Sequence, residues 1–233
     1  MNNKNILIVG ASSGIGLALA NQLTSKGHNV YSLSRSRPNI DGINFETWDA
    51  ENPSPIPTDF LPQNLDALVY CPGTINLKPF HRLTEADFKK DFQINVLGAV
   101  SIAQQVLPLL KKASEGASVL FFSTVAVQTG MGFHASVAAS KGAIEGLTRS
   151  LAAEWAGNNI RVNAIAPSLT DTPLAKNLLG SPERIEASNK RHPIGRFGTS
   201  EEVAAMASFL IEDTGKWITG QVIGMNGGLG NLR

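Results

Sequence analysis

The sequence has almost no cysteine and almost no net charge. Cys71 is the single cysteine among 233 residues, which excludes an internal disulfide framework and suits a reducing compartment. The formal net charge of +1 gives no electrostatic reason to expect binding to nucleic acid or to an acidic membrane surface. An uninterrupted apolar run of about 20 residues, as a membrane span requires, is also lacking. With no recognisable signal peptide before the first apolar run, we expect a cytoplasmic protein.

What the sequence does have is a series of short apolar runs separated by helical patterns. The runs are Ile6–Val9, Val30–Leu33, Ile43–Trp48, Ala67–Tyr70, Val119–Phe122, Ile160–Ile165 and Val222–Met225. The helical patterns are Gly16–Ser25, Glu85–Leu110, Ala135–Trp155 and Glu201–Ile211. Alternation of strand and helix predicts an α/β fold, a doubly wound parallel sheet with helices on both faces. Residues 1–233 fit a single domain of ordinary size.

Two connections have features of their own. Four prolines between Trp48 and Leu65 forbid a regular crossover helix, so we expect an extended loop or a single turn there. Thr84, with Asp87 three residues later, predicts a cap at the start of a long helix that runs to Leu110.

Three glycines, Gly10, Gly14 and Gly16, stand between the first predicted strand and the first predicted helix. A strand, a glycine turn and a helix in this order place a diphosphate at a helix N-terminus, where free N–H groups and the helix dipole favour an anion. Glycine is needed where the backbone adopts a positive φ or lies against the ligand. The pattern predicts a dinucleotide site, although an ordinary strand-to-helix turn would look similar.

Further motifs follow in a definite order: Asn95 in Ile-Asn-Val-Leu-Gly, Ser123-Thr124 after a buried run, Lys141 in Val-Ala-Ala-Ser-Lys, then Asn163–Thr172 and Thr219–Gly228. With these motifs the chain resembles the short-chain dehydrogenase/reductase family over nearly its whole length, closest to its 3-oxoacyl-carrier-protein-reductase-like branch. The resemblance implies a Rossmann-type fold of about seven parallel strands, a nicotinamide cofactor, and a homodimer or homotetramer built on the two long helices.

The resemblance also implies roles for individual residues. Asn95 matches a structural and proton-relay asparagine, Lys141 holds the nicotinamide ribose, and Thr124 stands where a serine polarises the substrate carbonyl. Asp49 matches the acidic residue near the adenine, and Thr172 the threonine near the carboxamide. The full set implied to contact the cofactor is Gly10, Ser12, Ser13, Gly14, Ile15, Gly16, Ser34, Arg35, Asp49, Gly73, Lys141, Pro167, Thr170 and Thr172. No metal ligands are implied.

The sequence departs from the family pattern at the catalytic tyrosine. Val137 occupies the position four residues before Lys141, and residues four apart share a helix face. Valine has no proton to donate, and general acid catalysis typically contributes about 10²- to 10⁴-fold. His134 is a candidate substitute, because an imidazole titrates near neutrality, but it also fits a solvent-facing loop. Ser136 and Ser140 are expected to point away from this face.

Two milder departures accompany it. Tyr70-Cys-Pro-Gly73 replaces the family's Asn-Asn-Ala-Gly, which puts local hydrogen bonding in doubt, and Ser168 stands where the family prefers glycine.

Arg35, next to Ser34 at the end of the second strand, favours NADP(H) over NAD(H), because arginine pairs with a 2′-phosphate. Arg35 and Arg37 would look the same as solvated loop charges. Residues 173–198 are expected to form a lid segment on the substrate side, with patchy helix and several basic residues. These charges fit either an anionic carrier or a solvated face.

Two functions remain open from the sequence. The first is an NADP(H)-dependent oxidoreductase of a small carbonyl or alcohol, free or linked to an acyl carrier, with an atypical proton donor. The second is a catalytically impaired or inactive NADP(H)-binding sensor or assembly protein. The nearly complete set of motifs favours the first and Val137 the second. Unrelated chemistry on the same fold is a third alternative, because fold does not fix function.

Overall fold

The computed structural model describes residues 3–57 and 59–232, and within them seven parallel strands form one sheet. These strands are β1 (Asn5–Val9), β2 (Asn29–Ser34), β3 (Asn44–Thr47), β4 (Ala67–Tyr70), β5 (Ala117–Phe122), β6 (Ile160–Pro167) and β9 (Val222–Met225). Their order is β3-β2-β1-β4-β5-β6-β9, so the direction of winding reverses between β1 and β4. The predicted Rossmann-type parallel sheet is confirmed, and ligands in such sheets bind beyond the carboxyl ends of the strands at this reversal.

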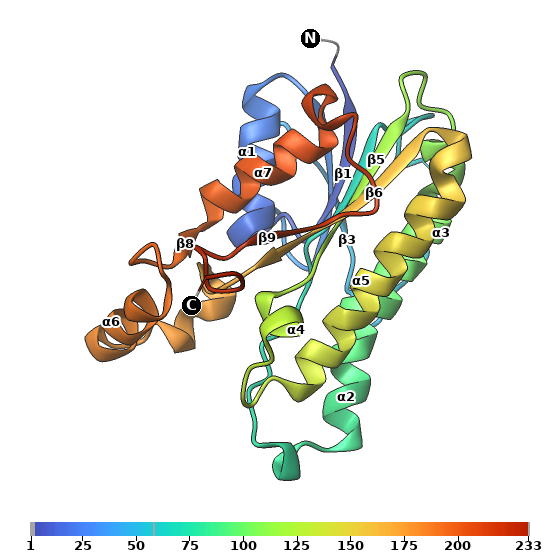
Figure 1. Cartoon of the computed structure of the whole chain (residues 1–233). Helices are drawn as coiled ribbons and strands as arrows, with labels where there is room; N and C mark the ends of the chain where they lie inside the picture. Colours follow the sequence, from blue (N-terminus) through green and yellow to red (C-terminus); the bar gives the residue numbers. More distant parts are fainter. Residues whose placement is uncertain (1–2, 58, 233) are drawn as a thin grey trace.

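Helices cover both faces of the sheet (Figure 1). One face carries α1 (Gly14–Ser25) and α7 (Ser200–Ile211), which pack together, and the other carries α3 (Gly98–Leu110) and α5 (Ala135–Trp155). β1 lies between two apolar cores: Ile6 and Ile8 pack on the α1–α7 side, Leu7 and Val9 on the α3–α5 side. A strand alternates its side chains, so a continuous apolar run is needed to fill both cores.

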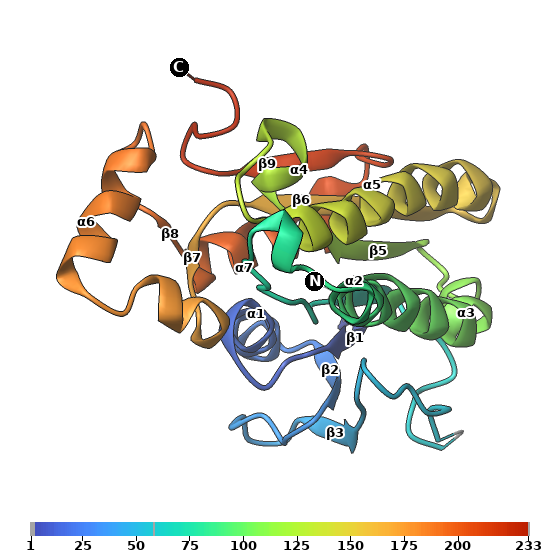
Figure 2. The ribbon, with the colours of Figure 1, turned by 90° about the horizontal axis from the view of Figure 1, so that it is seen from below.

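The remaining elements are short and several lie around the carboxyl edge of the sheet. They are α2 (Glu85–Phe92), α4 (Val125–Thr129), α6 (Pro182–Arg191), the strand pair β7 (Thr170–Asp171) and β8 (Gly198–Thr199), and the short helical turns Phe80–Arg82, Gln93–Leu97, Ala156–Asn158, Pro173–Leu178 and Asp213–Gly215. Seen from below, α6 lies apart from the sheet at one side of the molecule (Figure 2).

The long helix predicted from Thr84 to Leu110 is helical from Glu85 but contains a π-helical turn at Gln93–Leu97. The Tyr70 hydroxyl donates to the Ile94 carbonyl at 2.6 Å, which satisfies an acceptor inside the widened turn. A Cβ at Gly98 would lie 2.3 Å from the same hydroxyl, so glycine is needed there. Thr84 caps the helix as predicted, accepting from the Asp87 N–H.

This helix has a window of mean hydropathy 1.3, long and apolar enough by composition to span a membrane. Its contacts with β4, β5 and α5 are instead those of a core helix.

The proline-rich connection between β3 and β4 contains no helix or strand within its described residues, position 58 lying outside them. Within this connection the Phe60 N–H donates to the Pro57 carbonyl at 3.2 Å. The Trp48 indole donates to the Ser54 carbonyl, and the Ile56 N–H to the Gln105 side chain, so the loop is held against the body of the protein. The prediction of an extended loop or a single turn in place of a crossover helix is confirmed for the described residues.

Candidate active site

The glycine turn between β1 and α1 leaves a helix N-terminus free for an anion. Gly10 and Gly14 have φ angles of +85° and +54°, which side chains other than glycine rarely adopt. A Cβ at Gly16 would lie 2.2 Å from the Gly10 carbonyl oxygen, so the turn closes only around glycine. Ser13, the residue before α1, forms no side-chain cap to the helix. The first N–H groups of α1 therefore lack a side-chain acceptor, and the turn fits a diphosphate.

One cavity of about 970 Å³ runs from this turn across the carboxyl edge of the sheet. It collects nearly all the residues that the sequence singled out: Gly10, Ser12, Ser13, Gly14, Ile15, Gly16, Ser34, Arg35, Asp49, Gly73, Thr124, His134, Lys141, Pro167, Thr170 and Thr172. The volume is ample for a dinucleotide and leaves room for a small substrate. Its charged lining is mostly basic, with Arg35, Lys141, Arg184 and Arg191 against Asp49 and Glu51.

Asn95 is the exception, because it does not line the cavity. Its side chain is buried in the π-helical turn, where Nδ2 donates to Thr74 Oγ1 at 3.0 Å and to Ser140 Oγ at 2.9 Å. Its Oδ1 has no partner among the described residues. A Cβ at Gly73 would lie 3.5 Å from that oxygen and 3.4 Å from Lys141 Nζ. Asn95 therefore lies just behind Gly73, beside the lysine.

Lys141 is a buried cation on α5. Its Nζ donates to the Phe122 carbonyl at 2.8 Å, at the end of β5. Burial lowers the pKa of Lys141 to about 8, against smaller opposing effects of Cys71 and Asp91. Burial also raises the pKa of the Cys71 thiol to about 12, so this thiol stays protonated at neutral pH. Lys141 is thus easier to deprotonate than an exposed lysine and presents its amine to the cavity.

Val137 also lines the cavity, one helical turn before Lys141, and is only 6 % exposed. Its side chain offers no hydrogen bond. Ser140 points away from it as expected, because its Oγ donates to the Val137 carbonyl and contacts Asn95. Ser136 is also buried and lies outside the cavity lining.

Two other polar groups lie on the same part of the cavity wall. Thr124 follows β5 by two residues and caps α4, its Oγ1 accepting from the Ala126 N–H at 3.3 Å. The hydroxyl proton remains free to donate to a substrate oxygen. His134 immediately precedes α5, and its Nδ1 lies 2.6 Å from the Gly132 carbonyl. A carbonyl oxygen only accepts, so Nδ1 is the donor in this contact, and Nε2 is the acceptor of the neutral ring.

The structure separates the two arginines after β2. Arg37 donates to the Ile43 carbonyl and lies over the Phe45 ring, with 5.7 Å between its Cζ and the ring centre. Arg35 is exposed and lines the cavity, and it forms no ion pair or hydrogen bond within the part of the chain that the structure describes. Ser34 is buried and donates to the Ser36 carbonyl. Arg35 is the basic group available to a ligand phosphate.

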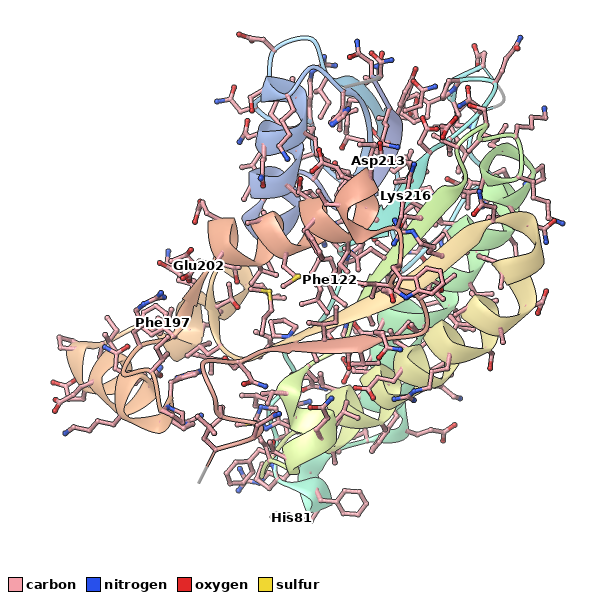
Figure 3. All side chains as sticks on the ribbon, turned by 45° about the horizontal axis from the view of Figure 1, so that its top comes forward. His81, Phe122, Phe197, Glu202, Asp213 and Lys216 are labelled. Atoms are coloured by element: carbon pink, nitrogen blue, oxygen red, sulfur yellow. The ribbon has the colours of Figure 1, made fainter. Side chains whose placement is uncertain are left out.

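The segment 173–198 folds as the helical turn Pro173–Leu178, α6 and the start of β8. Of its basic residues, Arg184 and Arg191 line the cavity. Lys190 pairs with Glu186, and Arg196 pairs with Glu202. Glu202 is labelled close to Phe197 in Figure 3. Part of the charge therefore borders the cavity and part belongs to a solvated face.

One pair at the cavity was not recognised from the sequence. His192 follows α6 and is 3 % exposed, with Nε2 2.8 Å from Ser168 Oγ and Nδ1 2.7 Å from the Ser188 carbonyl. The sequence identified Ser168 only as a mild change and gave no signal for His192, because 24 residues separate the two.

Known proteins resemble this chain throughout its length. A family model described as enoyl-(acyl carrier protein) reductase matches residues 58–230. The 3-oxoacyl-(acyl-carrier-protein) reductase FabG of Thermotoga maritima is 33 % identical, over 98 % of this chain and 98 % of its own. A tropinone reductase homolog of Arabidopsis thaliana is 32 % identical, over 98 % of this chain and 94 % of its own.

The fold of this chain also resembles solved structures over nearly its whole length. The aldohexose dehydrogenase of Thermoplasma acidophilum is 26 % identical with a TM-score of 0.88, covering 98 % of this chain and 94 % of its own. RhlG of Pseudomonas aeruginosa, solved as an active-site complex with NADP, is 28 % identical with a TM-score of 0.88, covering 99 % and 97 %.

Proposed function

Because the chain belongs to the short-chain dehydrogenase/reductase family of oxidoreductases, we propose that it interconverts a carbonyl and an alcohol with NADP(H), using an atypical proton donor. The observation that carries the proposal is the continuous cavity that joins the glycine turn to Thr124 and Lys141, with Val137 at the position where the family has its phenol. A nicotinamide cofactor, when bound, supplies or accepts the hydride.

The residues present fit that cofactor. The free N-terminus of α1 would hold the diphosphate, because Ser13 leaves its N–H groups uncapped. Lys141 would hold the nicotinamide ribose. Thr172 would lie near the carboxamide, and its side chain is close to the glycine turn, since a Cβ at Gly14 would lie 3.2 Å from Thr172 Cγ2. Thr124 would donate a hydrogen bond from its free hydroxyl to the substrate carbonyl oxygen, which would stabilise the negative charge that develops there.

The second candidate function is an NADP(H)-binding sensor or assembly protein without turnover. Val137 favours it, because the cavity lacks a phenol where the family places one. The two functions differ in whether bound NADPH is consumed, so one experiment separates them.

That experiment combines binding with turnover. We expect NADPH to bind in a titration of its fluorescence, and a panel of ketones, aldehydes and acyl-carrier-linked 3-oxo thioesters to include at least one compound that consumes it. Turnover is measured as loss of nicotinamide absorbance, with boiled protein as the background. Binding of NADPH without turnover of any compound would refute the enzyme and favour the sensor.

The proposed preference for NADP(H) rests on Arg35. We expect Arg35→Ala to weaken NADPH binding by about tenfold, because a charge-assisted hydrogen bond contributes about 1.5–3 kcal/mol and part of this is screened at an exposed site. NADH binding should stay unchanged. Arg37→Ala is the matched control, because Arg37 is held by the Ile43 carbonyl and the Phe45 ring. Isothermal titration with both cofactors measures the effect, and equal weakening of NADPH and NADH would contradict it.

We further propose a cytoplasmic homodimer or homotetramer that acts on a small carbonyl or alcohol, free or carrier-linked. Phe92 and Leu97, large apolar side chains on the long helix, are exposed and support contact between copies. Arg184 and Arg191 at the cavity mouth suit an anionic substrate arm.

A further inference from the structure

We propose that Ser168 and His192 together deliver the proton that Val137 cannot. Ser168 acts as the catalytic donor to the substrate oxygen, and His192 acts through it as a positioning residue that restores its proton. The inference rests on the proposed carbonyl–alcohol function and assigns its proton donor.

The position of Ser168 is fixed by the sheet. β5 and β6 pair with Phe122 opposite Ile165, and the Ser123 N–H extends this pairing by donating to the Ile165 carbonyl at 2.7 Å. Ser168 follows β6 by one residue, and its N–H donates to the Met225 carbonyl of β9 at 3.1 Å. The register therefore places Ser168 beside the Thr124–Val125 segment on the neighbouring strand end. Ser168 and Thr124 both line the cavity.

The hydrogen bonds of His192 define its tautomer. A carbonyl oxygen only accepts, so Nδ1, 2.7 Å from the Ser188 carbonyl, must carry a proton. In the neutral ring Nε2 is then an acceptor, and the Ser168 hydroxyl donates to it at 2.8 Å. When the ring is protonated, Nε2–H donates to Ser168 Oγ instead, and the serine proton is free for the cavity. The pair thus presents a donor or an acceptor according to the protonation of His192.

The imidazole is held on several sides. Ser188 lies in the last turn of α6, and His192 directly follows this helix. Ser168 lies in the connection between β6 and β7. On a third side a Cβ at Gly227 would lie 3.5 Å from His192 Cδ2, and the Ile194 N–H donates to the Gly227 carbonyl. A histidine that is 3 % exposed with both nitrogens bonded has one orientation, as a proton-handling group requires.

The charged groups on these elements leave the ring without an ion pair among the described residues. On α6, Lys190 pairs with Glu186, while Arg184 and Arg191 line the cavity. The Ser168–Thr170 connection and the Gly227–Leu232 turn carry no charged side chain. Of the cations on α6, Arg184 and Arg191 are thus on the cavity side, where an anionic substrate arm would neutralise them.

The proton balance of reduction is complete with these groups. The carbonyl carbon gains a hydride, which the proposed cofactor supplies, and the carbonyl oxygen gains the Ser168 hydroxyl proton. Ser168 Oγ gains the proton of protonated His192 Nε2, which leaves a neutral imidazole that is reprotonated from solvent. Oxidation of the alcohol runs the same transfers in reverse, with His192 neutral at the start.

The test compares four variants of the whole protein with the same carbonyl substrate. We expect Ser168→Ala and His192→Gln to lower kcat by about 10²-fold, with little change in the KM for NADPH. Glutamine can still accept the serine hydrogen bond but cannot exchange a proton. His134→Ala tests the other candidate histidine, and His81→Ala is the matched control, since His81 lies at the lower edge of the molecule, away from Phe122 (Figure 3). His81→Ala should retain wild-type kcat, and a loss of kcat in His134→Ala with none in His192→Gln would overturn the proposal.

The pH profile distinguishes proton delivery from packing. The wild-type kcat for reduction should fall as pH rises and protonated His192 is lost, and this dependence should be absent in His192→Gln. Ser168→Thr, which keeps the hydroxyl, should restore activity. Unchanged kcat in Ser168→Ala, or an unchanged pH profile in His192→Gln, would overturn the proposal while carbonyl reduction itself stands.

A second readout does not depend on turnover. In ¹⁵N-labelled protein at high pH, NMR should find neutral His192 protonated at Nδ1, with its Nε2 resonance displaced in Ser168→Ala. An Nε2–H tautomer would overturn the proposal. A wild-type protein that binds NADPH but reduces nothing would overturn the proposed function, and the proton role with it.

Discussion

Replacing Val137 with tyrosine in the Ser168→Ala variant is expected to raise kcat for carbonyl reduction by about 10²-fold, because the phenol then supplies the general acid that this variant lacks. Residue 137 lines the cavity one helical turn before Lys141, whose buried amine lies at the same wall. A phenol there would be placed beside a cation, which lowers its pKa and makes it a better donor near neutral pH.

The structure leaves space for this side chain. Val137 borders a cavity of about 970 Å³, so the added ring can extend into the cavity instead of into the core. Val137→Phe is the matched control, because it adds the ring without the hydroxyl. Nicotinamide absorbance under saturating NADPH measures kcat for both variants.

The outcome also bears on Ser168. A tyrosine donor would make the Ser168–His192 pair redundant, so Val137→Tyr with Ser168→Ala should be nearly as active as Val137→Tyr alone. Equal activation by phenylalanine would show that the ring, and not the proton, was responsible. A variant with both Val137→Tyr and Ser168→Ala that is no faster than Ser168→Ala would mean that a phenol at position 137 does not deliver the proton.

Replacing Lys141 with methionine is expected to change how stability depends on pH and to weaken cofactor binding. Burial lowers the pKa of Lys141 to about 8 from its usual 10.5. Below pH 8 the amine is protonated in the folded and the unfolded protein, and burying that charge costs about 3 kcal/mol of the free energy of unfolding. Methionine fills a similar volume without the charge.

The direction of the pH effect on the free energy of unfolding follows from the number of protons that each state binds. Between about pH 8 and pH 10.5 the unfolded chain keeps the lysine proton while the folded chain has lost it, so raising the pH favours the folded state. The wild-type free energy of unfolding should therefore rise by about 3 kcal/mol relative to Lys141→Met across this window. Urea unfolding at pH 7 and at pH 10.5 measures the difference.

Lys89→Met is the matched control, because Lys89 is an exposed lysine paired with Glu85 on the same protein. It should show no such difference between the two pH values. If Lys141→Met follows the wild-type curve throughout, Lys141 is charged at pH 10.5 in the folded state. The same variant should bind NADPH more weakly, since it lacks the amine proposed to hold the ribose.

The strands, the glycine turn and the long helices could be predicted from the sequence, because each is a local pattern. Short apolar runs predict buried strands, and the prolines between Trp48 and Leu65 exclude a regular helix, whatever surrounds them in the fold. Even so, the π-helical turn at Gln93–Leu97 was missed. The Tyr70 hydroxyl on β4 donates to the Ile94 carbonyl inside this turn, and no local pattern encodes a contact between segments 24 residues apart.

The candidate site divides in the same way. The sequence by itself determined the glycine turn and the lack of a proton donor at position 137: Gly10 and Gly14 have positive φ angles, a Cβ at Gly16 would meet the Gly10 carbonyl, and valine lacks a proton wherever it lies. Only the tertiary structure separated Arg35 from Arg37 and brought His192 to Ser168. The His192–Ser168 contact joins segments that are 24 residues apart, and no local pattern encodes such a contact.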